Sequence, residues 1–130
     1  MLTLNLRSPM LLLQRLRPAL SRSPVGAVVS ISSSAARGDQ AYTAPEYAVA
    51  KAGLIRLTTT VADWSQRFDV RVSCVVPDWI GLPRAVEQLR AMPADDRPAL
   101  IPPADIANQV LRLVTDPASG GRVIVINAPG

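Results

Sequence analysis

Histidine is absent from the 130 residues, and Cys74 is the single cysteine. These two facts exclude a metal site built from histidine and cysteine ligands, and they exclude catalysis by a serine–histidine or cysteine–histidine pair. A lone cysteine forms no internal disulfide, and the valines around Cys74 predict that it is a small buried residue. We therefore expect a protein of the reducing cytoplasm that holds no metal.

Acidic residues and long apolar runs are missing from the first 37 residues, where four arginines lie among leucines: Arg7, Arg15, Arg17 and Arg22. Such a composition is found in transit peptides and also in amphipathic helices. We favour the helix, because no cleavage signal follows a clear apolar stretch. Apolar runs such as residues 10–13 are too short to span a bilayer, so no membrane partner is predicted.

Charged residues make up 18% of the chain and apolar residues 48%, a balance that favours one globular domain over residues 1–130. The net charge of +4 is spread along the chain without any run of like charge. Nucleic-acid binding is therefore not indicated.

Valine-rich apolar runs predict three strands, and helical spacing of apolar residues predicts the helices between them. The strands are expected at 27–31, which we predict to be buried on both faces, and at 70–76 and 123–126. The helices are expected at 4–20, where Pro18 should end or kink the helix, at 45–67, at 84–91, and from Asp105 to the stop at Asp116 and Pro117. This alternation predicts an α/β fold with a parallel sheet.

Tyr47 and Lys51 lie four residues apart at the start of the predicted helix 45–67, so both side chains project from one face. A nearby ammonium favours the phenolate form of a phenol, which would let Tyr47 exchange a proton with a carbonyl or alcohol. By itself such a pair is common on solvated helices. Two observations favour a catalytic role for this pair: Lys51 is the only lysine, and a serine cluster, residues 32–34, ends the preceding strand.

The segments Gly26-Ala-Val-Val-Ser-Ile-Ser-Ser33 and Pro45-Glu-Tyr-Ala-Val-Ala-Lys-Ala-Gly53 together resemble the active-site region of the short-chain dehydrogenase/reductase family. The second segment contains the Tyr-x-x-x-Lys motif. The resemblance implies that Ser33 hydrogen-bonds the substrate oxygen, that Tyr47 is the general acid or base, and that Lys51 binds the nicotinamide ribose of NAD or NADP. It also implies a hydride transfer between this cofactor and a carbonyl or alcohol substrate.

Two members of this implied site have alternatives. Asn5, in Asn-Leu-Arg-Ser-Pro9, is similar to the family's asparagine that supports a proton-relay water beside the lysine, but an asparagine near a helix start also serves as a cap. Ser33 has neighbours in Ser32 and Ser34 that could satisfy backbone groups at the strand end. Alignment from the strand favours Ser33.

The stretch Arg71-Val-Ser-Cys-Val-Val-Pro-Asp-Trp-Ile80 is similar to the family's next strand and loop, whose backbone contacts the nicotinamide carboxamide. The implied cofactor contacts are Pro77, Asp78 and Ile80. Asp78 stands where the family has a glycine, which permits positive φ and close approach, and it adds a negative charge. Leu82 stands where many members have a threonine, so the resemblance leaves cofactor affinity open here.

The resemblance reaches the end of the chain, through Ile101-Pro-Pro-Ala-Asp-Ile-Ala107 and Gly120-Gly-Arg-Val-Ile-Val-Ile-Asn127. It covers the C-terminal half of a Rossmann-like doubly wound sheet, with three parallel strands, and the family's glycine-rich phosphate turn is not found in these 130 residues. The function is therefore predicted as an NAD(P)-dependent oxidoreductase. An inactive fragment and a non-enzymatic assembly module are the alternatives.

The substrate and its partners are less defined. The variable segment 82–102 contains Arg84 and Arg90, which could meet an acidic substrate but more simply belong to a solvated turn with Glu87 between them. We also predict a homo-oligomer that pairs the first two helices, as is common in the resembled family. The candidate interface residues are Leu13, Leu16, Leu57 and Val61.

Overall fold

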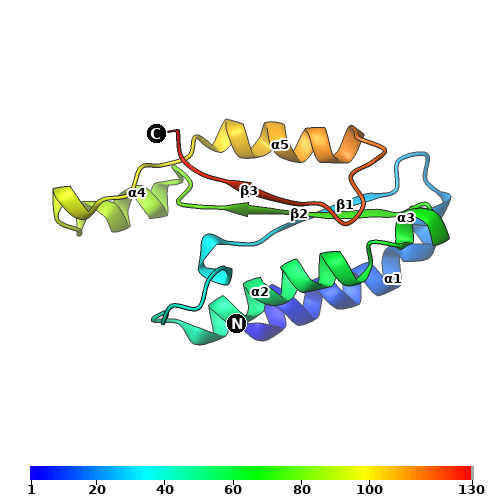
Figure 1. Cartoon of the computed structure of the whole chain (residues 1–130), viewed down its shortest axis with the longest axis horizontal. Coiled ribbons are helices and arrows are strands. Elements are labelled where there is room, and N and C mark those ends of the chain that lie inside the picture. Colours follow the sequence, from blue (N-terminus) through cyan, green and yellow to red (C-terminus); the bar gives the residue numbers. More distant parts are fainter. Residues whose placement is uncertain (130) are drawn as a thin grey trace.

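The computed structural model describes residues 1–129 as helices packed around a small sheet (Figure 1). In chain order the elements are the π-helical turn η1 (Thr3–Arg7), α1 (Ser8–Arg22), β1 (Ala27–Ile31), the 3-10 turn η2 (Ser34–Ala36), α2 (Pro45–Thr60), α3 (Trp64–Arg67), β2 (Arg71–Pro77), α4 (Pro83–Arg90), the 3-10 turn η3 (Ala94–Asp96), α5 (Pro103–Thr115) and β3 (Val123–Ile126). Each of the three predicted strands is present within one residue of its expected bounds.

The three strands form one parallel sheet in the order β1-β2-β3, which confirms the predicted topology. Ala27 pairs with Arg71 at the start of the β1–β2 ladder, and Cys74 pairs with Val123 at the start of the β2–β3 ladder. In Figure 1, α1, α2 and α3 lie against one face of the sheet and α5 against the other. The chain therefore has the doubly wound α/β architecture that parallel strands require for burial.

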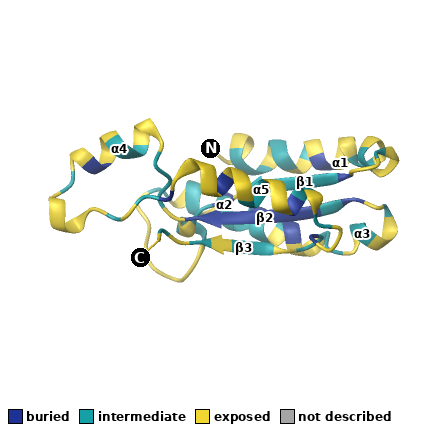
Figure 2. Cartoon of the chain, turned by 90° about the horizontal axis from the view of Figure 1, so that it is seen from above, coloured by how far each residue is buried: buried dark blue, intermediate teal, exposed yellow. Residues whose placement is uncertain are grey.

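Burial is concentrated on the central strand. Every residue of β2 after Arg71 is buried, whereas β1 and β3 are only partly buried (Figure 2). The prediction that residues 27–31 are buried on both faces is therefore wrong, because the side of β1 away from β2 has no neighbouring strand among the described residues. The core beneath the sheet combines buried and partly buried residues: Leu13, Val70 and Val72, surrounded by Leu20, Val28, Leu57, Val61, Trp64 and Phe68.

The predicted helix 45–67 is divided into α2 and α3. The division follows three consecutive threonines, whose hydroxyls donate to carbonyls of the preceding turn; Thr60 Oγ1, for example, lies 2.7 Å from the Leu57 oxygen. β-Branched residues with such bonds disfavour a continuing helix. The apolar periodicity of the sequence does not reveal the break between α2 and α3, because Trp64 packs against the core although it belongs to the second helix.

α1 continues through Pro18 to Arg22, so of the two predicted effects of this proline, ending the helix or kinking it, the first does not occur. Proline removes one backbone N–H donor. The helix is retained because Leu13 and Leu20, on either side of Pro18, pack into the core. Within residues 1–129, no helix combines the length and the apolar character that crossing a membrane requires.

Of the four residues proposed for a subunit interface, one is buried, two are partly buried and one is exposed. Leu13 is buried, and Leu57 and Val61 pack against the same core. Only Leu16 of the four candidates is exposed. The burial of Leu13 argues against this residue as part of an interface, and the pairing of the first two helices between subunits stays a prediction.

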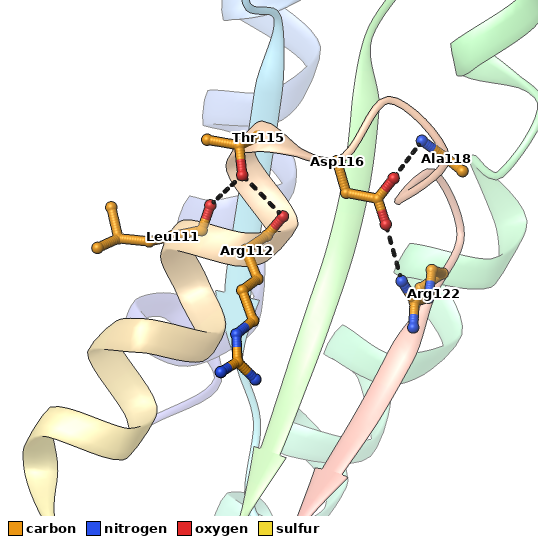
Figure 3. A network of polar contacts seen from close by, with 6 residues as sticks. All are labelled: Leu111, Arg112, Thr115, Asp116, Ala118 and Arg122. Atoms are coloured by element: carbon orange, nitrogen blue, oxygen red, sulfur yellow. Dashed lines mark hydrogen bonds and ion pairs between the residues drawn. The ribbon is translucent and has the colours of Figure 1, made fainter.

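The connection from α5 to β3 is closed by Asp116 (Figure 3). Its Oδ1 accepts from the Ala118 N–H at 2.8 Å, and its Oδ2 accepts from Arg122 Nη1 at 3.0 Å. Gly121 follows with φ of 78°, a conformation that favours glycine. The expected turn at Gly120 and Gly121 is confirmed, and it returns the chain into the sheet beside β2.

Gly26 permits the close approach of three segments at the start of β1. A Cβ at this position would lie 2.5 Å from the Leu20 oxygen and 2.9 Å from the Asp69 oxygen, both backbone atoms. We expect Gly26→Ala to lower the free energy of unfolding by about 1–3 kcal/mol, measured by chemical denaturation. Gly81→Ala is the control, because its Cβ would meet no atom closer than 3.5 Å and should change stability by only about 0.5 kcal/mol. Equal stability of the two variants would contradict this packing account.

Candidate active site

The predicted site residues gather where the parallel strands end. Ser32, Ser33 and Ser34 follow β1, Asp78 follows β2, and the first turns of α2 contribute Tyr47 and Lys51. A hydrogen bond of 3.2 Å from Ser34 Oγ to Asp78 Oδ1 joins the two loops. The carboxyl ends of the strands are where ligands bind to such sheets.

Lys51 reaches from α2 to the end of β1. Its Nζ donates to the Ile31 carbonyl oxygen at 2.9 Å and lies 5.7 Å from the centroid of the Tyr47 ring. Burial lowers the pKa of Lys51 below its usual range, and the neighbouring Cys74 opposes this shift. The structure thus brings the sole lysine and the predicted general acid together, as their spacing on one helix face predicts.

Tyr47 is half-buried, and its hydroxyl has no hydrogen-bond partner among residues 1–129. The phenol is therefore free to form a hydrogen bond with another molecule. The ring is stacked on that of Tyr42, with centroids 6.2 Å apart and an interplanar angle of 27°. Tyr42 is not among the site residues predicted from the sequence. The available signal was an aromatic residue in a polar loop only five positions before Tyr47.

The three serines have different environments. Ser32 is buried, and its hydroxyl donates to the Lys51 backbone oxygen at 2.7 Å, which fastens α2 to the strand end. Ser34 is exposed and donates to Asp78. Ser33 Oγ accepts from the Ala35 N–H at 3.2 Å and caps η2. Because this bond uses the Ser33 oxygen as an acceptor, the hydroxyl proton of Ser33 remains available to a ligand.

Asn5 lies in the π-helical turn η1 and, with Lys51, lines a groove of about 410 Å³ between α1 and β1. Its Nδ2 donates to the Met1 carbonyl oxygen at 3.1 Å. The cap of α1 is Arg7, which makes no side-chain capping bond. Asn5 therefore does not cap the helix, and π-helical turns of this kind occur frequently at functional sites.

The loop after β2 presents backbone groups at the same edge of the sheet. Ile80 and Ile101 form an isolated parallel bridge in which the Gly81 and Ile101 amides donate, while the Ile80 N–H has no acceptor within residues 1–129. Asp69 is the only non-glycine residue of the described chain with positive φ. Asp78 is therefore not strained in this structure, although its carboxylate remains exposed beside Ser34.

Three other residues considered in the sequence do not contribute to this cluster: Cys74, Arg84 and Arg90. Cys74 is fully buried, as predicted, and burial raises the pKa of its thiol, which keeps the thiol protonated at neutral pH. Arg84 and Arg90 are exposed on α4, which projects away from the sheet (Figure 2). Their surroundings agree with a solvated helix.

Comparison with known proteins gives a consistent result. A family model described as enoyl-(acyl carrier protein) reductase matches residues 1–127. A candidate short-chain dehydrogenase/reductase from Burkholderia xenovorans is 28% identical with a TM-score of 0.80, and the match covers 97% of this chain and 53% of that one. Comparison with curated proteins gives no match.

Two further solved structures were determined with a cofactor. A Caenorhabditis elegans short-chain dehydrogenase/reductase with cofactor is 29% identical, with a TM-score of 0.75 over 95% of this chain and 52% of that one. A Shigella flexneri short-chain dehydrogenase in complex with NADP is 26% identical, with a TM-score of 0.76 over 95% of this chain and 51% of that one.

These matches agree with the parallel α/β sheet. The chain belongs to the short-chain dehydrogenase/reductase family. It spans about half the length of the solved relatives.

Proposed function

We propose that this chain supplies the catalytic half of an NAD(P)-dependent oxidoreductase that interconverts a carbonyl and an alcohol. The observation that carries the proposal is the placement of the Lys51 ammonium, 5.7 Å from the Tyr47 ring and 2.9 Å from the Ile31 oxygen, at the carboxyl edge of the sheet. A phenol with no internal partner beside a cation is suited to proton exchange.

Each side chain then has a defined task in carbonyl reduction. Tyr47 donates its phenolic proton to the carbonyl oxygen, and Lys51 stabilises the phenolate that remains. Ser33 donates a hydrogen bond from its hydroxyl to the same oxygen and so fixes the substrate, while keeping its own proton. Asn5 lines the same groove as Lys51 and would support a water there that returns the proton.

NAD or NADP, when bound, would supply or accept the hydride. The groups present fit the nicotinamide end of such a cofactor: Lys51 and Tyr47 on α2, and the backbone of Pro77, Asp78 and Ile80 with its free N–H. The 130 residues contain no glycine-rich turn that leads into a helix, which is the usual site for pyrophosphate. Activity therefore requires a nucleotide-binding half in addition to these residues.

The test is a joined enzyme, in which the first half of the Shigella flexneri relative precedes residues 1–130. This relative is chosen because its structure contains NADP. We expect the joined enzyme to bind NADPH and to consume it when ketones or aldehydes from a panel are added. A folded joined enzyme that binds NADPH but reduces no member of a broad panel would contradict the proposal.

The open edge of β1 favours a second candidate function, that of an assembly module. The Arg71 N–H donates to the Gly26 oxygen at 2.8 Å and the Ser32 N–H to the Val75 oxygen at 2.8 Å. By the two-residue period of a strand, Ala27, Val29 and Ile31 direct their backbone groups away from β2, and among these groups the Ile31 oxygen accepts from Lys51 Nζ while Ala27 and Val29 lie along the open edge. An unpaired apolar edge of this kind recruits another strand, and we infer homo-oligomers of the isolated chain in the cytoplasm.

A proline pair tests the role of this edge. Val29→Pro removes an outward N–H without touching the β1–β2 ladder, so we expect it to fold and to weaken self-association in sedimentation experiments. Ser30→Pro removes an N–H that faces β2 and should lower stability instead. A parental chain that stays monomeric at high micromolar concentration would argue against association through β1.

A further inference from the structure

We propose that Tyr42 is a positioning residue for Tyr47, whose ring it holds in the orientation required beside Lys51. The proposal rests on the proposed role of Tyr47 in proton transfer. The two rings are stacked, with centroids 6.2 Å apart and an angle of 27° between their planes. This separation lies within the range in which aromatic pairs attract each other.

Tyr42 has no role in the core that would otherwise explain it. Its side chain is 47% exposed and lies in the loop between η2 and α2. Within residues 1–129, positions 38–43 of this loop make no hydrogen bond to the rest of the chain. The aromatic stack is therefore the directional contact that ties the loop to α2.

The Tyr47 ring receives two contacts that together restrict its rotation. The Lys51 ammonium lies 5.7 Å from the ring centroid, within the range of a cation–π interaction, and the Tyr42 ring supplies the second contact. A catalytic group is effective only when its orientation is fixed by surrounding side chains. Loss of Tyr42 should thus leave the phenol in place on α2 but allow its ring to turn away from the substrate oxygen.

The chain offers a direct test because Tyr42 and Tyr47 are its only tyrosines. With tyrosine labelled in the ring with carbon-13, Tyr42→Phe and Tyr42→Leu each leave a single labelled ring. We expect the order parameter and χ1 coupling constants of Tyr47 to keep their parental values in Tyr42→Phe and to become averaged in Tyr42→Leu. The same order in both variants would overturn the proposal. Circular dichroism checks that both variants fold.

Turnover of the joined enzyme gives the second readout. Tyr42→Leu should lower kcat by about 3- to 10-fold with KM unchanged, and Tyr42→Phe should keep kcat within about twofold, because a phenyl ring still stacks. Equal kcat values for the two variants would overturn the positioning role. Turnover that survives Tyr47→Phe would instead overturn the proposed function. The order parameters of Tyr47 in the Tyr42 variants are measured without turnover, so the two failures can be distinguished.

Discussion

Tyr47→Phe in the joined enzyme should lower kcat by about 10²–10⁴-fold, the range lost when a positioned proton donor is removed. The substitution deletes only the phenolic hydroxyl, which forms no hydrogen bond within residues 1–129. The fold and the stack with Tyr42 should therefore persist. Steady-state kinetics with NADPH measure kcat, and thermal unfolding measures the stability of the variant.

Lys51→Met is the companion variant. It removes the cation beside the Tyr47 ring and the bond to the Ile31 oxygen, so both kcat and NADPH affinity should fall, whereas Tyr47→Phe should affect mainly kcat. Near-parental turnover of Tyr47→Phe would disprove the proton-transfer role. An NADPH affinity that is unchanged in Lys51→Met would disprove the contact of Lys51 with the cofactor.

The second large effect concerns the cofactor itself. Residues 1–130 alone should bind NADPH at least about 100-fold more weakly than the joined enzyme, which corresponds to a loss of about 2.7 kcal/mol or more. In the proposed function these residues contact only the nicotinamide end of the cofactor, and the 130 residues contain no glycine-rich turn whose backbone N–H groups would receive pyrophosphate. A hydride donor that is not anchored loses positioning, which can contribute about 7–11 kcal/mol to catalysis.

Fluorescence titration with NADH and NADPH measures this difference on the two purified proteins. The joined enzyme is the control, because it contains the same 130 residues together with a nucleotide-binding half. A low-micromolar dissociation constant with stoichiometric occupancy for residues 1–130 alone would show that these residues contain a complete cofactor site.

The strands were predictable because three valine-rich runs, each bounded by turn residues, have few alternatives in a chain of this length. The burial of 27–31 was not, because it depends on which strand becomes the edge of the sheet. The end of α2 depends on side chain to backbone bonds of consecutive threonines, which apolar periodicity does not register. Leu13 was assigned to an interface although it is buried, because an amphipathic face can pack on a sheet or on a partner.

The Tyr47 and Lys51 pair was predictable because a spacing of four on a helix fixes their neighbourhood. The separate tasks of Ser32, Ser33 and Ser34 were not, since they follow from contacts with α2 and with Asp78 far along the chain. The contact of Tyr42 with Tyr47 was not predictable either, because it depends on the path of the loop that carries Tyr42.

The central claim is that these residues move a proton while a nicotinamide exchanges hydride with a carbonyl carbon. Deuterium transfer tests this most directly. The joined enzyme is given NADPH deuterated at the nicotinamide C4 position together with the best carbonyl of the panel, and the alcohol product is analysed by mass spectrometry. We expect the parental enzyme to form an alcohol with one deuterium on the carbinol carbon, and Tyr47→Phe to form almost none of this product. The hydride could leave from either face of the nicotinamide, so the cofactor is labelled on each face in turn. An alcohol that carries no deuterium with either labelled cofactor would contradict the proposed hydride transfer.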